Sequence, residues 1–206
     1  MKEEIKKLSR YTTLPFLLDY LERKKLVLLD PSMWEDKNDS LIIENYKLKT
    51  KYKKVLALCF SYKNETIHHW KTFANGPSGC CIEFNGKKLI NIFKQNENLR
   101  HGVIRYKKIK DLYKSFTALN KIPFRKRVPY STEGEYRLIW ESFTDDKFEI
   151  DVPIEIITRI TFSQHIPVPV FETLRILLQN RYGVPSDKIR RSTIYENKRW
   201  INHFMY

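Results

Sequence analysis

The sequence has 206 residues, of which 42% are hydrophobic and 14% aromatic, and this composition excludes a disordered chain and favours a globular fold with a sizeable core. Lysine and arginine outnumber aspartate and glutamate by 38 to 24, which gives a formal net charge of +14. An excess of this size favours phosphate-rich partners, namely nucleic acid, nucleotides or an anionic membrane surface. No apolar run approaches the length of a membrane span, and residues 1–5 are charged, unlike a signal peptide. We therefore expect a cytoplasmic protein with no membrane partner.

The first half of the chain contains both helical and strand patterns. Thr12 and Thr13 can cap a helix that has Pro15 in its first turn and ends near Lys24. The hydrophobic pattern then predicts a strand over residues 26–29, an amphipathic helix over 39–50, a central strand over 55–61, a helix from Asn64 onward and a strand over 80–84.

The second half is predicted to hold a short helix near 86–95, a strand over 102–106, a basic helix around 108–120, a loop over 121–132, a strand from Glu133, another over 154–162 and a helix over 170–181. Helices come first and strands cluster in the middle, without regular βαβ alternation. This order favours the α+β class with a central mixed or antiparallel sheet. We see no repeat and no linker, so residues 1–206 are predicted to form a single domain.

The three cysteines, Cys59, Cys80 and Cys81, lie within apolar strand patterns and are expected to be reduced core residues. No Cys/His spacing matches a zinc site. His68 and His69 are adjacent, so on a helix they would point about 100° apart and could not easily chelate one ion. We therefore expect no metal.

Basic residues gather in one segment. Residues 98–137 contain 11 lysines and arginines against three acids, which is +8 of the total charge. Tyr106, Tyr113, Phe116 and Phe124 are interleaved with these cations and could stack on unpaired bases. The alternative is that the aromatics are core and the lysines only solvate a helix. The residues predicted to bind nucleic acid are Lys107, Lys108, Lys110, Arg125, Lys126 and Arg127.

The most informative stretch is Glu133-Gly134-Glu135-Tyr136-Arg137, which begins an apolar run. Because side chains alternate along a strand, Glu133, Glu135 and Arg137 are expected to share one face. Two neighbouring carboxylates repel each other, so one tends toward a raised pKa unless a cation such as Arg137 offsets it. Such a pair can divide two roles, charge stabilisation and proton transfer. The alternative is an edge strand with a solvated charged face.

Taken together, several motifs resemble a bacterial family of domains of unknown function. They occur in the right order over most of the chain as Arg10-Tyr11-Thr12, the loop from Asp30 to Asp39, Cys59-Phe60-Ser61, Trp70 with Gly79 to Phe84, and Glu133 to Arg137. That family often has tryptophan three residues before the first glutamate, where this chain has Tyr130. The arrangement is also similar to the ADP-ribosyltransferase superfamily, most nearly to the DarT-like enzymes that modify nucleic acid.

The resemblance implies an ADP-ribosyltransferase-like fold and NAD as co-substrate. Glu135 would then stabilise the positive charge that develops on the ribose, Glu133 would orient or deprotonate the acceptor, and Arg10 would bind the pyrophosphate. The remaining candidates for NAD binding are Tyr11, Thr12, Ser61, Trp70 and Tyr106. The leading interpretation is therefore an ADP-ribosyltransferase that acts on nucleic acid, with RNA as the expected acceptor, as a toxin or anti-phage effector, and with an antitoxin or chaperone as a possible protein partner.

Each implied role has an alternative. Trp70 lies on an apolar helix face and could be core, Arg10 could pair with a surface acid, and Trp34 with Asp36 and Asp39 could simply anchor a loop. Two other functions also fit the composition: a metal-independent nuclease that uses the basic cluster with histidine and glutamate, and a non-catalytic nucleic-acid-binding module. No glycine-rich phosphate-binding motif occurs, which excludes Rossmann and P-loop folds.

Overall fold

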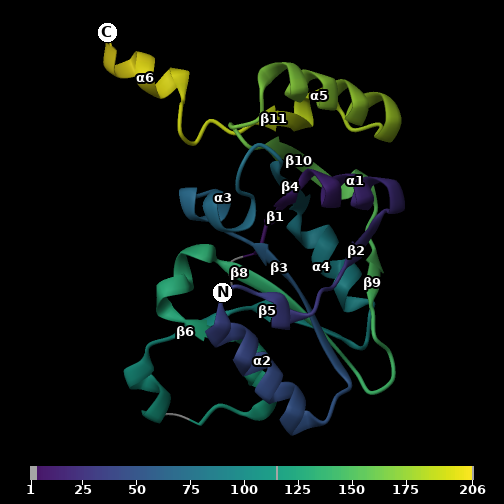
Figure 1. Cartoon of the computed structure of the whole chain (residues 1–206), viewed down its shortest axis with the longest axis vertical. Coiled ribbons are helices and arrows are strands. Elements are labelled where there is room, and N and C mark those ends of the chain that lie inside the picture. Colours follow the sequence, from purple (N-terminus) through teal and green to yellow (C-terminus); the bar gives the residue numbers. More distant parts are fainter. Residues whose placement is uncertain (1–3, 115, 206) are drawn as a thin grey trace.

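The computed structural model describes residues 4–114 and 116–205 and is built on a seven-stranded sheet (Figure 1). The strand order is β11 (Ile189–Arg191), β10 (Ile157–Phe162), β4 (Gly79–Asn85), β1 (Lys7–Thr13), β3 (Lys54–Ser61), β8 (Glu135–Ser142) and β5 (Leu99–Val103). Only the β10–β11 pair is parallel among these described strands, so the sheet is mixed. The predicted α+β class with a central mixed sheet is confirmed.

Two short ribbons lie outside this sheet. Strands β2 (Lys25–Val27) and β9 (Glu149–Asp151) pair antiparallel, whereas β6 (Arg105–Lys107) and β7 (Arg125–Arg127) pair parallel. We call the second pair the β6–β7 ribbon. It follows β5 at the end of the sheet that carries β8, and it lies at the lower left of Figure 1.

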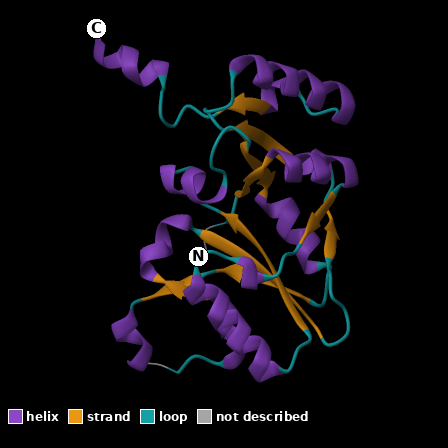
Figure 2. Ribbon diagram, in the orientation of Figure 1, coloured by secondary structure: helices purple, strands orange, loops and turns teal. Residues whose placement is uncertain are grey.

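Helices cover both faces of the sheet (Figure 2). On one face, α1 (Leu14–Arg23), α4 (Gly86–Lys94) and α5 (Val168–Tyr182) supply buried side chains to the main core, including Leu17, Leu89 and Leu178. Along β3, residues alternate between this core and a second cluster that α2 (Lys37–Thr50) covers with Ile43 and Tyr46. Helix α3 (Ile67–Phe73) supplies Trp70 to a third cluster with Cys81.

The C-terminal helix α6 (Lys198–Met205) extends away from the sheet and buries no residue (Figure 1). None of the described helices is long and apolar enough to cross a membrane. Residues 1–3, part of the segment in which no signal peptide is expected, lie outside the described residues.

The prediction of a basic helix around 108–120 is wrong for the residues that the structure describes. The chain forms two 3₁₀ segments instead, Ile109–Lys114 and Leu119–Phe124, and Ser115 between them lies outside the described residues. Leu112, Tyr113 and Phe116 are exposed, so no packed apolar face is available to stabilise an α-helix. The predicted strand over 102–106 is divided, because Ile104 separates β5 from β6 and donates its backbone N–H to the carbonyl of Glu135.

Candidate active site

Two carboxylates reach the site from the start of β8, but not in the predicted manner. Glu135 is the first residue of β8, whereas Glu133 ends the 3₁₀ turn Val128–Glu133. Gly134 between them has φ +54°, and a Cβ at this position would collide with the side chain of Lys63. The expectation that Glu133 shares a strand face with Glu135 is therefore wrong, because the left-handed glycine ends the alternation. The side chains of Glu133 and Glu135 nevertheless contact the same ammonium group, that of Lys126.

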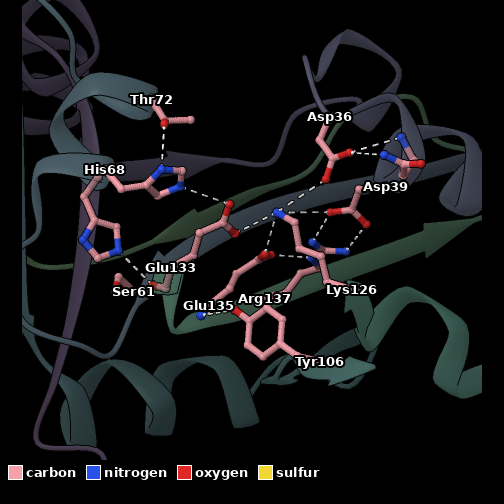
Figure 3. A network of polar contacts seen from close by, with 12 residues as sticks. Asp36, Asp39, Ser61, His68, Thr72, Tyr106, Lys126, Glu133, Glu135 and Arg137 are labelled. Carbon is pink, nitrogen blue, oxygen red and sulfur yellow. Dashed lines mark hydrogen bonds and ion pairs between the residues drawn. The ribbon is translucent and has the colours of Figure 1, made fainter. Parts of the chain in front are cut away.

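The Lys126 ammonium lies at the centre of four carboxylates (Figure 3). Its Nζ is 2.7 Å from Oε2 of Glu133, 3.4 Å from Oε2 of Glu135, 3.6 Å from Oδ2 of Asp39 and 4.0 Å from Oδ2 of Asp36. The Lys126 side chain is only 9% exposed. Lys126 was predicted to contact nucleic acid together with its basic neighbours, but the structure holds it inside the candidate active site.

Arg137 is the second cation of the cluster and is fully buried. Its Nε donates to Oε1 of Glu135 at 2.5 Å, which confirms the pairing expected from strand alternation. Its Nη1 and Nη2 donate to the two carboxylate oxygens of Asp39, at 3.0 and 2.5 Å. The guanidinium also lies over the ring of Trp34, 4.9 Å from its centroid. Trp34 and Asp39 thus hold Arg137, and Arg137 in turn holds Glu135.

The pKa values of the two glutamates are shifted in opposite directions. Burial opposes the charge of Glu135, yet the charges of Arg137 and Lys126 lower the pKa of Glu135 to about 2. Burial raises the pKa of Glu133 despite Lys126, and the neighbouring charge of Glu135 acts in the same direction. Glu135 is therefore ionised at neutral pH, and Glu133 is the better proton acceptor. Carboxylates whose environments separate their pKa values in this way can divide charge stabilisation from proton transfer.

The backbone of Glu133 is fixed by two side chains. Its carbonyl accepts from Oγ of Ser61 at 2.7 Å and from Nε2 of His69 at 2.9 Å. A carbonyl only accepts, so His69 carries its proton on Nε2, and its Nδ1 accepts from the backbone N–H of Thr66 at 3.2 Å. Burial lowers the pKa of His69, which agrees with a neutral ring.

Ser61 and Tyr106 were predicted to contact NAD, and the structure gives both hydrogen bonds that position the glutamates. Ser61 is buried, and its hydroxyl donates to the Glu133 carbonyl. The Tyr106 hydroxyl accepts from the backbone N–H of Glu135 at 3.0 Å. His68 approaches from the other side, with its Nε2 3.6 Å from Oε1 of Glu133. This Nε2 is buried and has no hydrogen-bond partner among the described residues.

Tyr11 and Trp70 lie together beside the site. The Tyr11 ring stacks on His69 at 4.8 Å between centroids and meets the edge of Trp70 at 5.5 Å. Trp70 is 4% exposed, and its indole N–H donates to Oε2 of Glu65 at 3.0 Å. Trp70 thus matches the core alternative, because its ring is packed against protein. Thr12 is buried in β1 opposite Cys80.

Arg10 lies on β1 opposite Ile82 and differs from the other cations of the site. Within the described part of the chain, its guanidinium forms no ion pair and no hydrogen bond, so it does not match the alternative of a surface pair. Burial lowers the pKa of Arg10, and its charge interacts with the Cys59 thiol. The Cys59 thiol also helps to lower the pKa of Glu135, so Arg10 and Glu135 have a common neighbour.

The basic segment is largely exposed. Lys108, Lys110 and Arg127 are exposed, and Lys107 and Arg125 are half-buried. Of the interleaved aromatics, Tyr113 is 92% and Phe116 94% exposed, whereas Phe124 packs against the cluster below α2. The core alternative is therefore wrong for Tyr113 and Phe116.

The sequence alone does not assign several residues of the candidate site to it. Asp39 and Trp34 belong to the loop motif from Asp30 to Asp39, so their signal was present but not assigned to Arg137. Lys126 and His69 gave no comparable signal. Lys126 lies among basic residues, which indicates an exposed surface that binds nucleic acid, and His69 lies on a short helix, where a histidine is usually a core residue.

No protein-family model matches the chain, and no curated protein matches it. Among solved structures, the chain is similar to Thermus sp. 2.9 DarT in complex with ADP-ribosylated ssDNA, at 11% identity and a TM-score of 0.47 over 92% of this chain and 95% of that one. It is also similar to the same protein in complex with NAD+, at 12% identity and a TM-score of 0.45 over 93% of this chain and 98% of that one.

Proposed function

We propose that this protein is an NAD-dependent ADP-ribosyltransferase whose acceptor is a nucleic acid. The observation that carries the proposal is the buried pair of glutamates with separated pKa values: Glu135 is ionised and rigidly held by Arg137, and Glu133 has a raised pKa. Pairs of this kind are typical of reactions that stabilise a positive charge at one atom and move a proton at another.

The reaction would proceed by cleavage of the nicotinamide–ribose bond, whose electron pair leaves with nicotinamide. The ribose then carries positive charge, which the Glu135 carboxylate stabilises where it develops. A nucleophilic atom of the acceptor forms the new bond to the same ribose carbon and releases its proton to Glu133. The higher pKa of Glu133 suits this second step, because a base is more effective when its pKa approaches the working pH.

Arg10 supports the binding of the NAD pyrophosphate. Arg10 is half-buried on β1 and has no ionic partner among the described residues, so its guanidinium is available to bind an anion. A guanidinium binds phosphate oxygens in a bidentate manner, and charge-assisted hydrogen bonds of this type contribute about 1.5–3 kcal/mol.

Arg10→Ala is therefore expected to weaken NAD binding by roughly ten- to a hundredfold, as measured by calorimetry. Arg159→Ala is the matched control, because Arg159 is also a half-buried arginine of the same sheet but pairs with Glu83, at 4.0 Å. The control should bind NAD as the wild type does. Equal affinity of the Arg10→Ala protein and the wild type would remove Arg10 from the site.

The acceptor surface is proposed to include the segment around Lys108 and Lys110. The exposed rings of Tyr113 and Phe116 next to these lysines support single-stranded nucleic acid, since unpaired bases can stack on them. RNA is the acceptor predicted from the sequence, and single-stranded DNA would meet the same groups.

Lys108→Glu with Lys110→Glu is expected to weaken binding of a labelled oligonucleotide, because repulsion replaces attraction to phosphate. The slope of log affinity against log salt should also fall, by about 0.7 for each phosphate that the variant no longer binds. Tyr113→Ala and Phe116→Ala should weaken binding with little change in this slope. An unchanged affinity in all of these variants would place the acceptor elsewhere.

The decisive test of the proposed function uses purified protein, labelled NAD and separate pools of RNA, single-stranded DNA and protein. Transfer of label to a nucleic-acid pool is the expected result. Transfer to protein alone would correct the acceptor class. Degradation of RNA without NAD would favour the nuclease, and binding without either reaction would favour the non-catalytic module.

A further inference from the structure

The β6–β7 ribbon has two chemically different faces. Tyr106 pairs with Lys126, and this central pair is flanked by Arg105 opposite Arg125 and Lys107 opposite Arg127. Paired residues share a face of a sheet and successive pairs alternate. The inner face is therefore Tyr106 with Lys126. The outer face is formed by Arg105, Lys107, Arg125 and Arg127.

The inner face closes the candidate active site. The Lys126 ammonium contacts both glutamates, and the ring of Tyr130 lies over it, 4.8 Å from ring centroid to Nζ. Glu133 and Glu135 are only 5% and 4% exposed beneath it. Figure 3 shows Lys126 and Tyr106 on the two sides of Glu135. In this state, a cation occupies the place where Glu135 would have to meet a positively charged ribose.

The outer face has four cations and no anion. None of its side chains forms an ion pair or a hydrogen bond with another described residue. Like charges directly opposite each other on paired strands are destabilising, as they are at Arg105 and Arg125. The Nε of Arg125 is in addition buried without a hydrogen-bond partner among the described residues. A row of unpaired guanidinium and ammonium groups of this kind fits the repeated phosphates of a nucleic-acid strand.

We propose that the outer face of the β6–β7 ribbon binds the phosphates of the acceptor strand, and that Lys126 then exchanges its carboxylate partners for an acceptor phosphate. This rests on the proposed ADP-ribosyltransferase function and adds its regulation. Lys126 holds Glu135 inactive until the acceptor is present, so NAD is not hydrolysed by water in the meantime.

The exchange follows from charge and from the lysine side chain. An ammonium 3.4 Å from Glu135 opposes the positive charge of the transition state that Glu135 must stabilise. Lysine is a point charge on a flexible stem and can change partners without a change of backbone. Arg125 and Arg127 flank Lys126 in the sequence but point to the opposite face, so the phosphate that Lys126 takes up is a neighbouring one, where the acceptor strand passes from the outer face around the ribbon into the active site.

The test measures nicotinamide release from NAD with and without poly(U) RNA or poly(dT) DNA. The wild type is expected to be slow alone and faster by about tenfold or more with one polymer. Lys126→Met should release nicotinamide rapidly without a polymer and gain little from it. Arg105→Gln with Arg127→Gln should lose most of the stimulation, whereas Arg159→Gln, outside the ribbon, should retain it.

Three results would overturn the proposal in different ways. A wild-type rate that is the same with and without either polymer would exclude acceptor control, even if transfer occurs. A folded Lys126→Met protein that is inactive under both conditions, beside an active wild type, would make Lys126 part of catalysis instead of its inhibitor. A wild type that neither releases nicotinamide nor transfers label under any condition would overturn the proposed function itself.

Discussion

Glu135→Gln is expected to lower the rate of NAD-dependent transfer by roughly a thousandfold or more. The substitution removes the charge that would stabilise the ribose cation, and one such electrostatic interaction is worth several kcal/mol in a closed site. The variant should still fold, with reduced stability: Arg137 and Lys126 lose one shared negative charge, but the glutamine oxygen can still accept from Nε of Arg137 and the backbone N–H can still donate to Tyr106. The measurement is transfer of label from NAD, with circular dichroism as the test of folding.

Glu141→Gln is the matched control for this variant. Glu141 lies on the same strand, β8, and pairs with an arginine, Arg100, but it lies in a different cluster, where it also accepts from the Tyr46 hydroxyl. Its activity should stay within a few-fold of the wild type. Transfer by a folded Glu135→Gln protein at the wild-type rate would refute the role of Glu135. Glu133→Gln should damage transfer to the acceptor more than nicotinamide release, because in the proposed mechanism Glu133 takes up the proton of the acceptor.

The sequence predicted the parts of the site that local periodicity determines. The pairing of Glu135 with Arg137 follows from alternation along a strand, and the apolar run over 55–61 is the strand β3 that lies next to β8. Position 133 could not be predicted in this way. A glycine in the left-handed conformation redirects the chain there, and strand alternation contains no information about such a turn.

The remaining contacts of the site join segments that are distant in the sequence. Asp39 is 98 residues from Arg137, and the two meet only because α2 packs across β3 and β8. Lys126 belongs to a segment that reads as a basic loop, and its burial depends on the β6–β7 ribbon, whose strands of three residues are too short to give a pattern. These contacts depend on tertiary packing, which overrides local preference.

Asp39→Asn is expected to destabilise the protein by about 3–5 kcal/mol. The variant removes the negative charge that both Arg137 and Lys126 contact and places amide hydrogens against the donors of Arg137. Arg137 would then be a fully buried cation with only Glu135 as an ionic partner, and breaking a buried pair in this way carries a large desolvation penalty. Urea unfolding of the variant and the wild type gives the difference in free energy of unfolding.

Asp19→Asn is the control that separates the effect of burial on stability from the effect of hydrogen-bond geometry. Asp19 accepts from Nε and Nη2 of Arg23 at 2.8 Å each, so it also forms a two-bonded pair with an arginine. That pair is exposed, with side chains 46% and 37% accessible, and exposed pairs contribute about 0–1 kcal/mol. A similar loss of stability in both variants would mean that the Asp39–Arg137 pair gains nothing from its burial. A small loss at Asp39 alone would mean that Lys126 and Glu135 can hold Arg137 without it, and the site would then be less rigid than its hydrogen bonds indicate.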